Sequence, residues 1–329
     1  MAKIQRRTLL GAAATTAAAS VLPFASTAFA QTGYPARPVR WIVPYQAGGP
    51  ADLLARLVTQ KLSEAWGQPV LVDNKPGGYT IIAASEAVRA QPDGYTLMQA
   101  IDATLVMNPS MFRKLPYDPQ KDFTHVCLLA ALPLVLIANQ QLKARSFSEL
   151  VAHARAHPGK MTCGFSTHAS QILVDRFSRA LDIEVVPVPY KGTADLVKGM
   201  LSGEIETAFD SSAPYTGYFE SGRIRAFVTS GPSRSLALPD IPTLNELGVK
   251  DIDTQIWHGV SAPAGLPAAV RDRIQKDVSQ ALHDPEVRRK LLIAGLEPRP
   301  STTAEYVKQI QQESARLAPV IKKLGIQLD

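Results

Sequence analysis

Four short loops carry the residue types that could capture an anion. Residues 45–49 and 76–80 each contain a pair of glycines, and residues 166–169 and 191–193 combine hydroxyl groups with a histidine or a lysine. Glycine lets a backbone approach a ligand closely. A predicted helix follows each loop, and the free N–H groups and dipole at a helix N-terminus favour negative charge. The chemistry predicted is the binding of a carboxylate.

The stretch 185–210 indicates how such a loop is positioned. Its apolar residues and flanking prolines predict a strand over 185–190, near the edge of a sheet. A polar turn, Lys191-Gly192-Thr193, leads into a helix over 194–203 and a strand over 205–210 that ends in Asp210. Thr193 is a natural N-cap whose hydroxyl we expect the ligand to share. Lys191 either neutralises an anionic ligand or is a solvated turn lysine.

Strands and helices alternate along the chain, which predicts an α/β fold with a parallel sheet. The predicted strands also include residues 39–44, 70–72, 95–100, 161–165 and 224–228, and the predicted helices 51–66, 81–90, 147–157, 171–180, 268–283 and 304–323. Ligands in open α/β sheets bind beyond the carboxyl ends of strands, where these loops lie. Asp52 lies in the first turn of its helix with Arg56 four residues later, so we expect it to support the first loop.

Residues 1–30 have the pattern of a cleaved signal peptide, which predicts export to a bacterial periplasm. Basic Lys3, Arg6 and Arg7 precede an apolar run, and Ala30 ends an A-x-A cleavage pattern. The arginine pair leaves both Sec and twin-arginine export open. Cleavage after Ala30 removes three basic residues and no acidic one, which lowers the net charge from +6 to +3. This mild charge argues against nucleic-acid binding, and the remaining length predicts two domains.

We expect no catalytic or metal-binding role for the two cysteines or for the paired histidines. Cys127 and Cys163 could pair in an exported protein, but both lie in strand-like runs, which favours two buried thiols. His153 and His157 are spaced like metal ligands, yet they lie at a predicted helix C-terminus where histidine is common. We therefore expect no metal and no cofactor.

A serine hydrolase is the main alternative. Gly164 to His168 weakly resembles a nucleophile elbow, and Ser166, Asp210 and His258 occur in the order of an α/β-hydrolase triad. His168 stands where the elbow requires its second glycine, and we therefore favour a binding protein over an enzyme.

The chain resembles the substrate-binding proteins of tripartite tricarboxylate transporters, the Bug receptors. The similar segments run through nearly all of the chain after residue 30 and include VPYQAGGPADLLAR, DNKPGG, PDGYTL, NPSMFRKLPYDPQKDF, VPYKGTADLVKGMLSGEIETAFD, ALPDIPTLNELG, HGVSAPAGLP and GIQLD. The resemblance implies a two-domain periplasmic-binding-protein fold of the Venus-flytrap, type II-like class, with two crossover strands as the hinge. It also implies a monomeric receptor that hands a small carboxylate to inner-membrane transporter subunits. A ligand sensor or scaffold protein would share this fold and remains open.

With this resemblance, domain 1 is expected at 31–133 plus 255–329 and domain 2 at 134–254. The expected binding residues are Tyr45, Gln46, Ala47, Gly48, Gly49, Gly77, Gly78, Tyr79, Thr80, Ile81, Asp102, Ala103, Ser166, Thr167, His168, Ala169, Tyr190, Lys191, Gly192, Thr193 and Asp210. The glycine pairs are expected to present backbone N–H groups to one ligand carboxylate.

The sequence departs from the family pattern where the ligand would be selected. Asp102 stands where small hydroxyl residues are usual, so it either disfavours a second bare charge or accepts a hydrogen bond from an amine or hydroxyl. Aromatic side chains near the loops, Tyr45, Tyr79, Phe165 and Trp257 with His258, could stack on a flat ligand. This favours an aromatic mono- or dicarboxylate. The alternative is that these rings pack in the hinge and the core and that Asp102 caps a local turn.

Overall fold

The computed structural model describes residues 33–250, 252 and 254–329. The predicted signal peptide therefore lies outside the described residues. Residues 35–329 form one compact unit. In the described part of the chain, no helix has the length and apolar character needed to cross a membrane.

Within the described residues, ten strands form one mixed sheet. They are β1 (Val39–Val43), β2 (Val70–Asn74), β3 (Thr96–Ile101), β4 (Phe123–Asn139), β5 (Thr162–Phe165), β6 (Val186–Pro189), β7 (Thr207–Ser211), β8 (Ile224–Thr229), β9 (Gln255–Pro263) and β10 (Glu297–Pro298). The order is β2-β1-β3-β9-β4-β7-β5-β6, with β8 and β10 also paired to β4. The two outer groups, β2-β1-β3 and β7-β5-β6, are parallel as predicted. The prediction of a parallel sheet is wrong in the centre, where every pairing of β4 and β9 is antiparallel.

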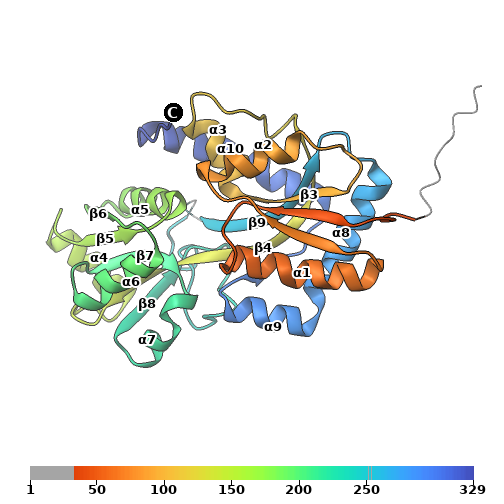
Figure 1. Cartoon of the computed structure of the whole chain (residues 1–329). Helices are drawn as coiled ribbons and strands as arrows, with labels where there is room; N and C mark the ends of the chain where they lie inside the picture. Colours follow the sequence, from red (N-terminus) through yellow and green to blue (C-terminus); the bar gives the residue numbers. More distant parts are fainter. Residues whose placement is uncertain (1–32, 251, 253) are drawn as a thin grey trace, which may run out of the picture. The chain divides into compact units, whose positions relative to one another are not determined.

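Strand β4 joins the two halves of the sheet. Up to Pro133 it pairs with β9, and from Leu134 onward it pairs with β7 and β8. All of its residues except Thr124 and His125 are buried, since elements cover both of its faces. Figure 1 shows β1, β3 and β9 on one side of β4 and β5 to β8 on the other. The change of partner falls at the boundary predicted between domains 1 and 2, and the division into two moving domains stays a prediction.

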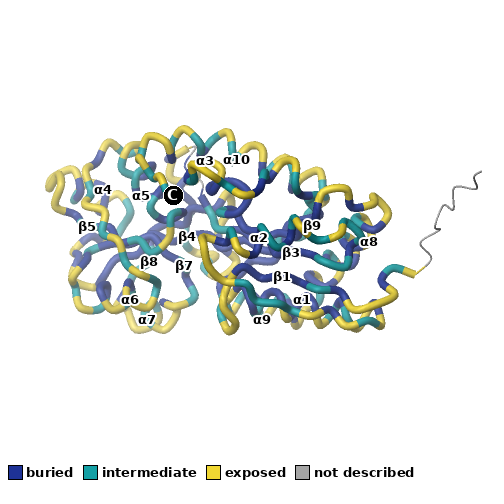
Figure 2. Tube along the Cα trace, turned by 45° about the horizontal axis from the view of Figure 1, so that its top comes forward, coloured by how far each residue is buried: buried dark blue, intermediate teal, exposed yellow. Residues whose placement is uncertain are grey.

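Helices cover the faces of this sheet. The longer ones are α1 (Pro50–Trp66), α2 (Ile81–Val88), α4 (Phe147–Ala156), α5 (His168–Leu181), α6 (Thr193–Ser202), α8 (Ala268–His283), α9 (Pro285–Ile293) and α10 (Thr303–Lys323). The shorter ones are η1 (Gly78–Thr80), η2 (Ala103–Met107), α3 (Asn108–Met111), η3 (Ala213–Tyr215) and α7 (Thr216–Glu220). Figure 2 shows the strands buried beneath helices whose outer surfaces are exposed.

Local sequence explains the boundaries of α1. Pro50 begins it, where a missing N–H costs nothing, and Gly67 ends it in the left-handed conformation with φ 63°. The edge position predicted for the strand before Lys191 is confirmed, because β6 is the last strand of the sheet. Cys127 and Cys163 are confirmed as buried free thiols, and burial raises the pKa of Cys163 to about 12.

Candidate functional site

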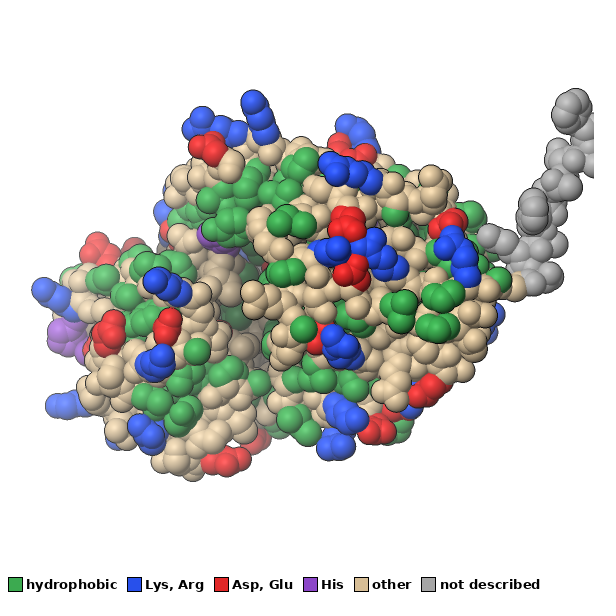
Figure 3. Space-filling view, in the orientation of Figure 1, with side chains coloured by type: hydrophobic (Ala, Val, Ile, Leu, Met, Phe, Trp, Pro, Cys, Tyr) green, Lys and Arg blue, Asp and Glu red, His purple; other side chains and the backbone are tan. Residues whose placement is uncertain are grey.

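A cavity of about 910 Å³ lies between the loops that follow β1, β2, β3, β5 and β6. Most of the predicted binding residues line it: Tyr45, Gln46, Ala47, Gly49, Gly77, Tyr79, Thr80, Asp102, Ala103, Ser166, Thr167, His168, Ala169, Tyr190 and Lys191. Figure 3 shows that this face of the molecule is hollowed, with mainly uncharged atoms around the hollow. The cavity is large enough for a small organic acid.

The first loop, residues 45–49, places the N-terminus of α1 against the cavity. Gly49 is its N-cap in an extended conformation, and no described side chain caps this end. Pro50 and Ala51 both line the cavity. Gln99 of β3 donates its Nε2 to the Ala51 carbonyl at 3.0 Å, which fixes the first helical turn. The open helix end is therefore a suitable place for a negatively charged group.

Asp52 supports this loop and does not line the cavity, as predicted. Its carboxylate accepts hydrogen bonds from the Gly48 N–H at 2.9 Å, Arg56 Nε at 2.8 Å and Asn74 Nδ2 at 3.0 Å. Burial alone raises the pKa of Asp52, but these hydrogen bonds outweigh it and the pKa is lowered. The prediction that Gly48 offers its N–H to a ligand is therefore wrong, because Asp52 already accepts it.

The second loop holds two non-glycine residues in the left-handed region. Tyr79 has φ 50° and Thr80 has φ 77°, directly after Gly77 and Gly78. Such conformations cost about 1–3 kcal/mol each. Asn108 stabilises them by donating Nδ2 to the Tyr79 carbonyl at 2.8 Å, and the Thr80 and Thr104 hydroxyl groups lie 2.8 Å apart. The loop is thus held in one shape beside the cavity, although Gly78 and Ile81 do not line it.

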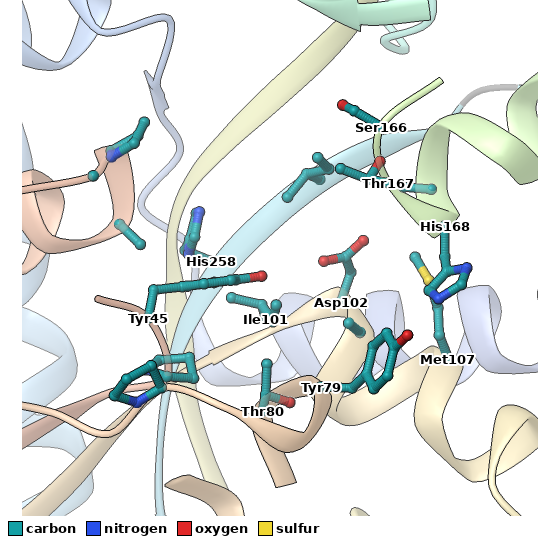
Figure 4. Close-up of a pocket in the computed structure, with 18 of the residues that line it drawn as sticks. Tyr45, Tyr79, Thr80, Ile101, Asp102, Met107, Ser166, Thr167, His168 and His258 are labelled. Carbon is teal, nitrogen blue, oxygen red and sulfur yellow. The ribbon is translucent and has the colours of Figure 1, made fainter. Parts of the chain in front are cut away.

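Asp102 lies in the floor of the cavity, at the end of β3. Its residue is only 3% exposed, and Figure 4 shows its carboxyl group between Tyr45 and Tyr79, directed into the cavity. Burial raises the pKa of Asp102 well above the ordinary value, and the negative charge of Glu313 on α10 adds to this. The floor therefore contains a carboxyl group that resists ionisation.

His258 enters the cavity from β9, whereas Trp257 does not. His258 is buried, its Nδ1 lies 3.3 Å from Gln99 Nε2, and burial lowers its pKa to about 4. Trp257 is wholly buried on the opposite face of the strand and donates its Nε1 to Glu313 at 2.7 Å. Neighbouring residues of a strand point to opposite faces. The suggestion that Trp257 lines the ligand site is therefore wrong.

The third loop contributes hydroxyl groups and one histidine. Thr167 is the N-cap of α5 and forms a capping box with Ser170, so its own helix already uses its hydroxyl. Ser166 lines the cavity, and its buried Oγ finds no hydrogen-bond partner in the described part of the chain. The His168 ring lies 5.5 Å from the Tyr79 ring, which links the second and third loops. Ser166 Oγ is thus a group that a ligand could satisfy.

The fourth loop departs from the prediction at its end. Tyr190 and Lys191 line the cavity, but Gly192, Thr193 and Asp210 do not. The N-cap of α6 is Gly192 and not Thr193. Thr193 Oγ1 instead donates to Asp210 Oδ1 at 3.3 Å. The expected convergence of four open helix ends is therefore wrong for α5, which is capped by its own threonine, and for α6, whose open start at Gly192 does not line the cavity.

The hydrolase alternative lacks its triad. Asp210 accepts hydrogen bonds from Tyr215 at 3.0 Å and from Thr193, whereas His258 contacts Gln99. Ser166 Oγ has neither of them as a described partner. A histidine with a pKa of about 4 would also be a weak base at neutral pH.

Other lining residues were not predicted. They are Pro44, Pro50, Ala51, Ile101, Met107, Gln171 and Ile256, whereas Pro76 belongs to the predicted loop 76–80. Pro50, Ala51 and Ile101 directly adjoin predicted loops, so a wider window would have included them. Met107 ends the π-helical turn η2, whose irregular hydrogen bonding has no periodic sequence signature.

Known proteins resemble this chain over nearly its full length. The model of the tripartite tricarboxylate transporter family receptor matches residues 54–326. Protein BugT of Bordetella pertussis is 30% identical over 298 residues, which are 90% of this chain and 91% of that protein. Among solved structures, R. palustris Rpa4515 with adipate has a TM-score of 0.75 at 30% identity and covers 90% of this chain and 100% of that one.

A second solved structure has the same arrangement. MatC from Rhodopseudomonas palustris with bound malate has a TM-score of 0.70 at 29% identity, over 88% of this chain and 100% of that one. These similarities confirm the predicted periplasmic-binding-protein fold. The chain belongs to the tripartite tricarboxylate transporter receptor family, whose members are solute-binding receptors and not enzymes.

Proposed function

We propose that the chain captures a small carboxylate in the cavity between the four loops and delivers it to the membrane subunits of a tripartite tricarboxylate-type transporter. The observation that carries this proposal is the uncapped N-terminus of α1 at the wall of the cavity. Its free N–H groups and dipole favour an anion. Similar proteins were solved with adipate and with malate, which are both carboxylates.

The receptor would act in the periplasm as a monomer, after removal of residues 1–30. The basic start, apolar run and A-x-A pattern of these residues support export. N-terminal sequencing of periplasmic material should begin at Gln31. A protein that retains Met1 there would contradict the cleavage.

An aromatic mono- or dicarboxylate is the ligand class that we favour. Tyr45, Tyr79, Phe165 and Tyr190 all line the cavity, and Tyr45 and Tyr79 are 41% and 53% exposed. Exposed rings beside a cavity offer faces on which a flat ligand could stack, at about 0.5–1.5 kcal/mol per pair beyond area burial.

A thermal-shift screen followed by calorimetry tests the ligand class. The compounds are citrate, succinate, adipate, malate, benzoate, terephthalate and nicotinate. A ligand at a hundredfold over Kd should add about 2.7 kcal/mol to the free energy of unfolding. Failure of every carboxylate would contradict the receptor proposal, and tight binding of citrate or adipate without an aromatic binder would contradict only the aromatic preference.

The variant Phe165→Leu separates stacking from cavity volume. It removes the ring and keeps an apolar side chain of similar bulk. We expect the affinity for an aromatic binder to fall about 2- to 12-fold, which corresponds to one stacked pair. The affinity for adipate should remain unchanged, and an equal loss for both ligands would show that Phe165 acts only through packing.

A further inference from the structure

We propose that Asp102 binds the ligand as a neutral carboxylic acid and donates a hydrogen bond to a carboxylate oxygen of the ligand. This inference rests on the proposed function, since it requires a carboxylate in the cavity. In this role Asp102 must hold a proton whenever the ligand carboxylate is bound. It also replaces the sequence-based expectation that Asp102 repels a second negative charge.

The position of Asp102 makes direct contact with a ligand possible. It lines the cavity although its residue is only 3% exposed, so the cavity is the open space next to its carboxyl group. In Figure 4 the hydroxyl end of Tyr45 points toward this group, and Tyr79 and Thr80 lie beside it. Asp102 therefore lies in the floor next to the two loops that are expected to hold the ligand carboxylate.

Burial, Glu313 and nearby backbone N–H groups act on the pKa of Asp102, and none of these is a cation. On α10, the negative charge of Glu313 raises the pKa of Asp102, and the charge of Asp102 in turn raises the pKa of Tyr306. From the first loop and β9 come Tyr45 and His258, and His258 is neutral at pH 7 because burial lowers its pKa to about 4. Glu313 is itself held by hydrogen bonds from Trp257 and Gln309.

The described residues that line the cavity include one permanent cation, Lys191. It is exposed and lies on the fourth loop, while Asp102 is buried at the end of β3. An ionised Asp102 beside a ligand carboxylate would place two negative charges next to each other at a buried position, and Lys191 is the one permanent cation among the described lining residues. Such an arrangement is costly, and two carboxyl groups in contact commonly share one proton instead.

Asp102 holds the proton in the complex. The proton is already present below the pKa of the free protein, and it is taken up from solvent above that pKa. Burial and Glu313 already raise the pKa of Asp102 in the free protein, and a bound anion raises that pKa further. Below the pKa of the free protein, binding takes up no proton and affinity does not depend on this group. Above it, each binding event takes up one proton, so the Kd should rise up to tenfold per pH unit.

Asp102→Asn tests this directly, because asparagine imitates the neutral acid and cannot ionise. The test uses whichever of the screened carboxylates binds. We expect Asp102→Asn to bind within about threefold of the original protein at pH 6, with no rise of Kd at higher pH from this group. Infrared spectra of the complex should show a protonated carboxyl band in the original protein that Asp102→Asn lacks, and above the pKa of free Asp102 this band should appear on ligand addition.

Two further variants locate the effect. Glu313→Gln removes a negative charge that raises the pKa of Asp102 and keeps an acceptor for Trp257. The pH at which affinity begins to fall should therefore move down. Asp272→Asn, an exposed carboxylate on α8 paired with Arg271, should change neither the band nor the affinity.

Each outcome decides between distinct chemistries. The infrared band in the original complex and its absence in Asp102→Asn would support the neutral acid. Absence of the band, with binding more than tenfold tighter in Asp102→Asn, would show an ionised group that repels the ligand. Absence of the band, with a hundredfold loss in Asp102→Asn, would show an ionised acceptor for an amine or hydroxyl. Either of these overturns the proposal while the receptor function stands, and failure of every carboxylate in the screen overturns both.

Discussion

At the scale of single residues, Gly77 tests how the second loop binds a carboxylate. Its φ of 114° is one that L-residues rarely adopt, and an added Cβ would lie 2.9 Å from Ile82 Cδ1. Gly77→Ala should distort the loop at the cavity wall, because strain of about 1–3 kcal/mol must be relieved. We expect the carboxylate affinity measured by calorimetry to fall at least tenfold, with a modest loss of Tm.

A matched variant separates loop shape from general destabilisation. Gly222 also has a positive φ, of 69°, and an added Cβ meets nothing within 4 Å. It lies before β8 and does not line the cavity. Gly222→Ala should lower Tm and leave the affinity unchanged. If Gly77→Ala binds as tightly as Gly222→Ala, the second loop does not depend on its glycine conformation.

At the scale of elements, Asp52 joins the first loop to α1 and β2, and its charge should make this junction pH-dependent. The pKa of Asp52 in the folded protein is lower than in the unfolded chain, so its stabilisation is present above the ordinary pKa of about 4. It is lost as the pH falls through the lower, folded pKa. Asp52→Asn should cost roughly 1–3 kcal/mol in urea unfolding at pH 7.

The difference between Asp52→Asn and the original protein should shrink in acid, below the folded pKa of Asp52. Asp272→Asn is a suitable control, since its carboxylate is exposed and supports no loop. A difference that stays constant down to the acid limit would mean that Asp52 acts through hydrogen-bond acceptors that asparagine lacks and not through its charge.

At the scale of the whole molecule, we propose that the parts on either side of β4 close on the ligand as a hinge. Pairing of β4 changes partner between Pro133 and Leu134, and on the return path Thr254 donates its N–H to Ser230 at 3.1 Å. The predicted crossover strands pass through these two positions, and we propose that they act as the hinge. Small-angle scattering should give a smaller radius of gyration with a saturating ligand, and an unchanged radius with a confirmed binder would contradict closure.

The sequence by itself determined the local elements and the loops around the site. Helix α8 has the predicted bounds, and α1, α6 and α10 begin within one residue of prediction, because apolar periodicity and terminal glycines act locally. The loops that line the cavity were found for the same reason: each combines glycine or small polar residues with the start of a helix. The motifs spread along the chain also identified the family.

Only the tertiary structure decided which groups are open to a ligand. The antiparallel centre of the sheet depends on pairing β3, β4 and β9, which are distant in sequence. The Gly48 N–H donates to Asp52, and the Thr193 hydroxyl donates to Asp210. Which hydrogen bonds form depends on the groups that the tertiary fold brings close together. His258 lines the cavity and Trp257 does not, because they lie on opposite faces of β9 and only one of these faces meets the cavity. Folding also buries Asp102 close to the negative charge of Glu313, an environment that its place in the sequence does not reveal.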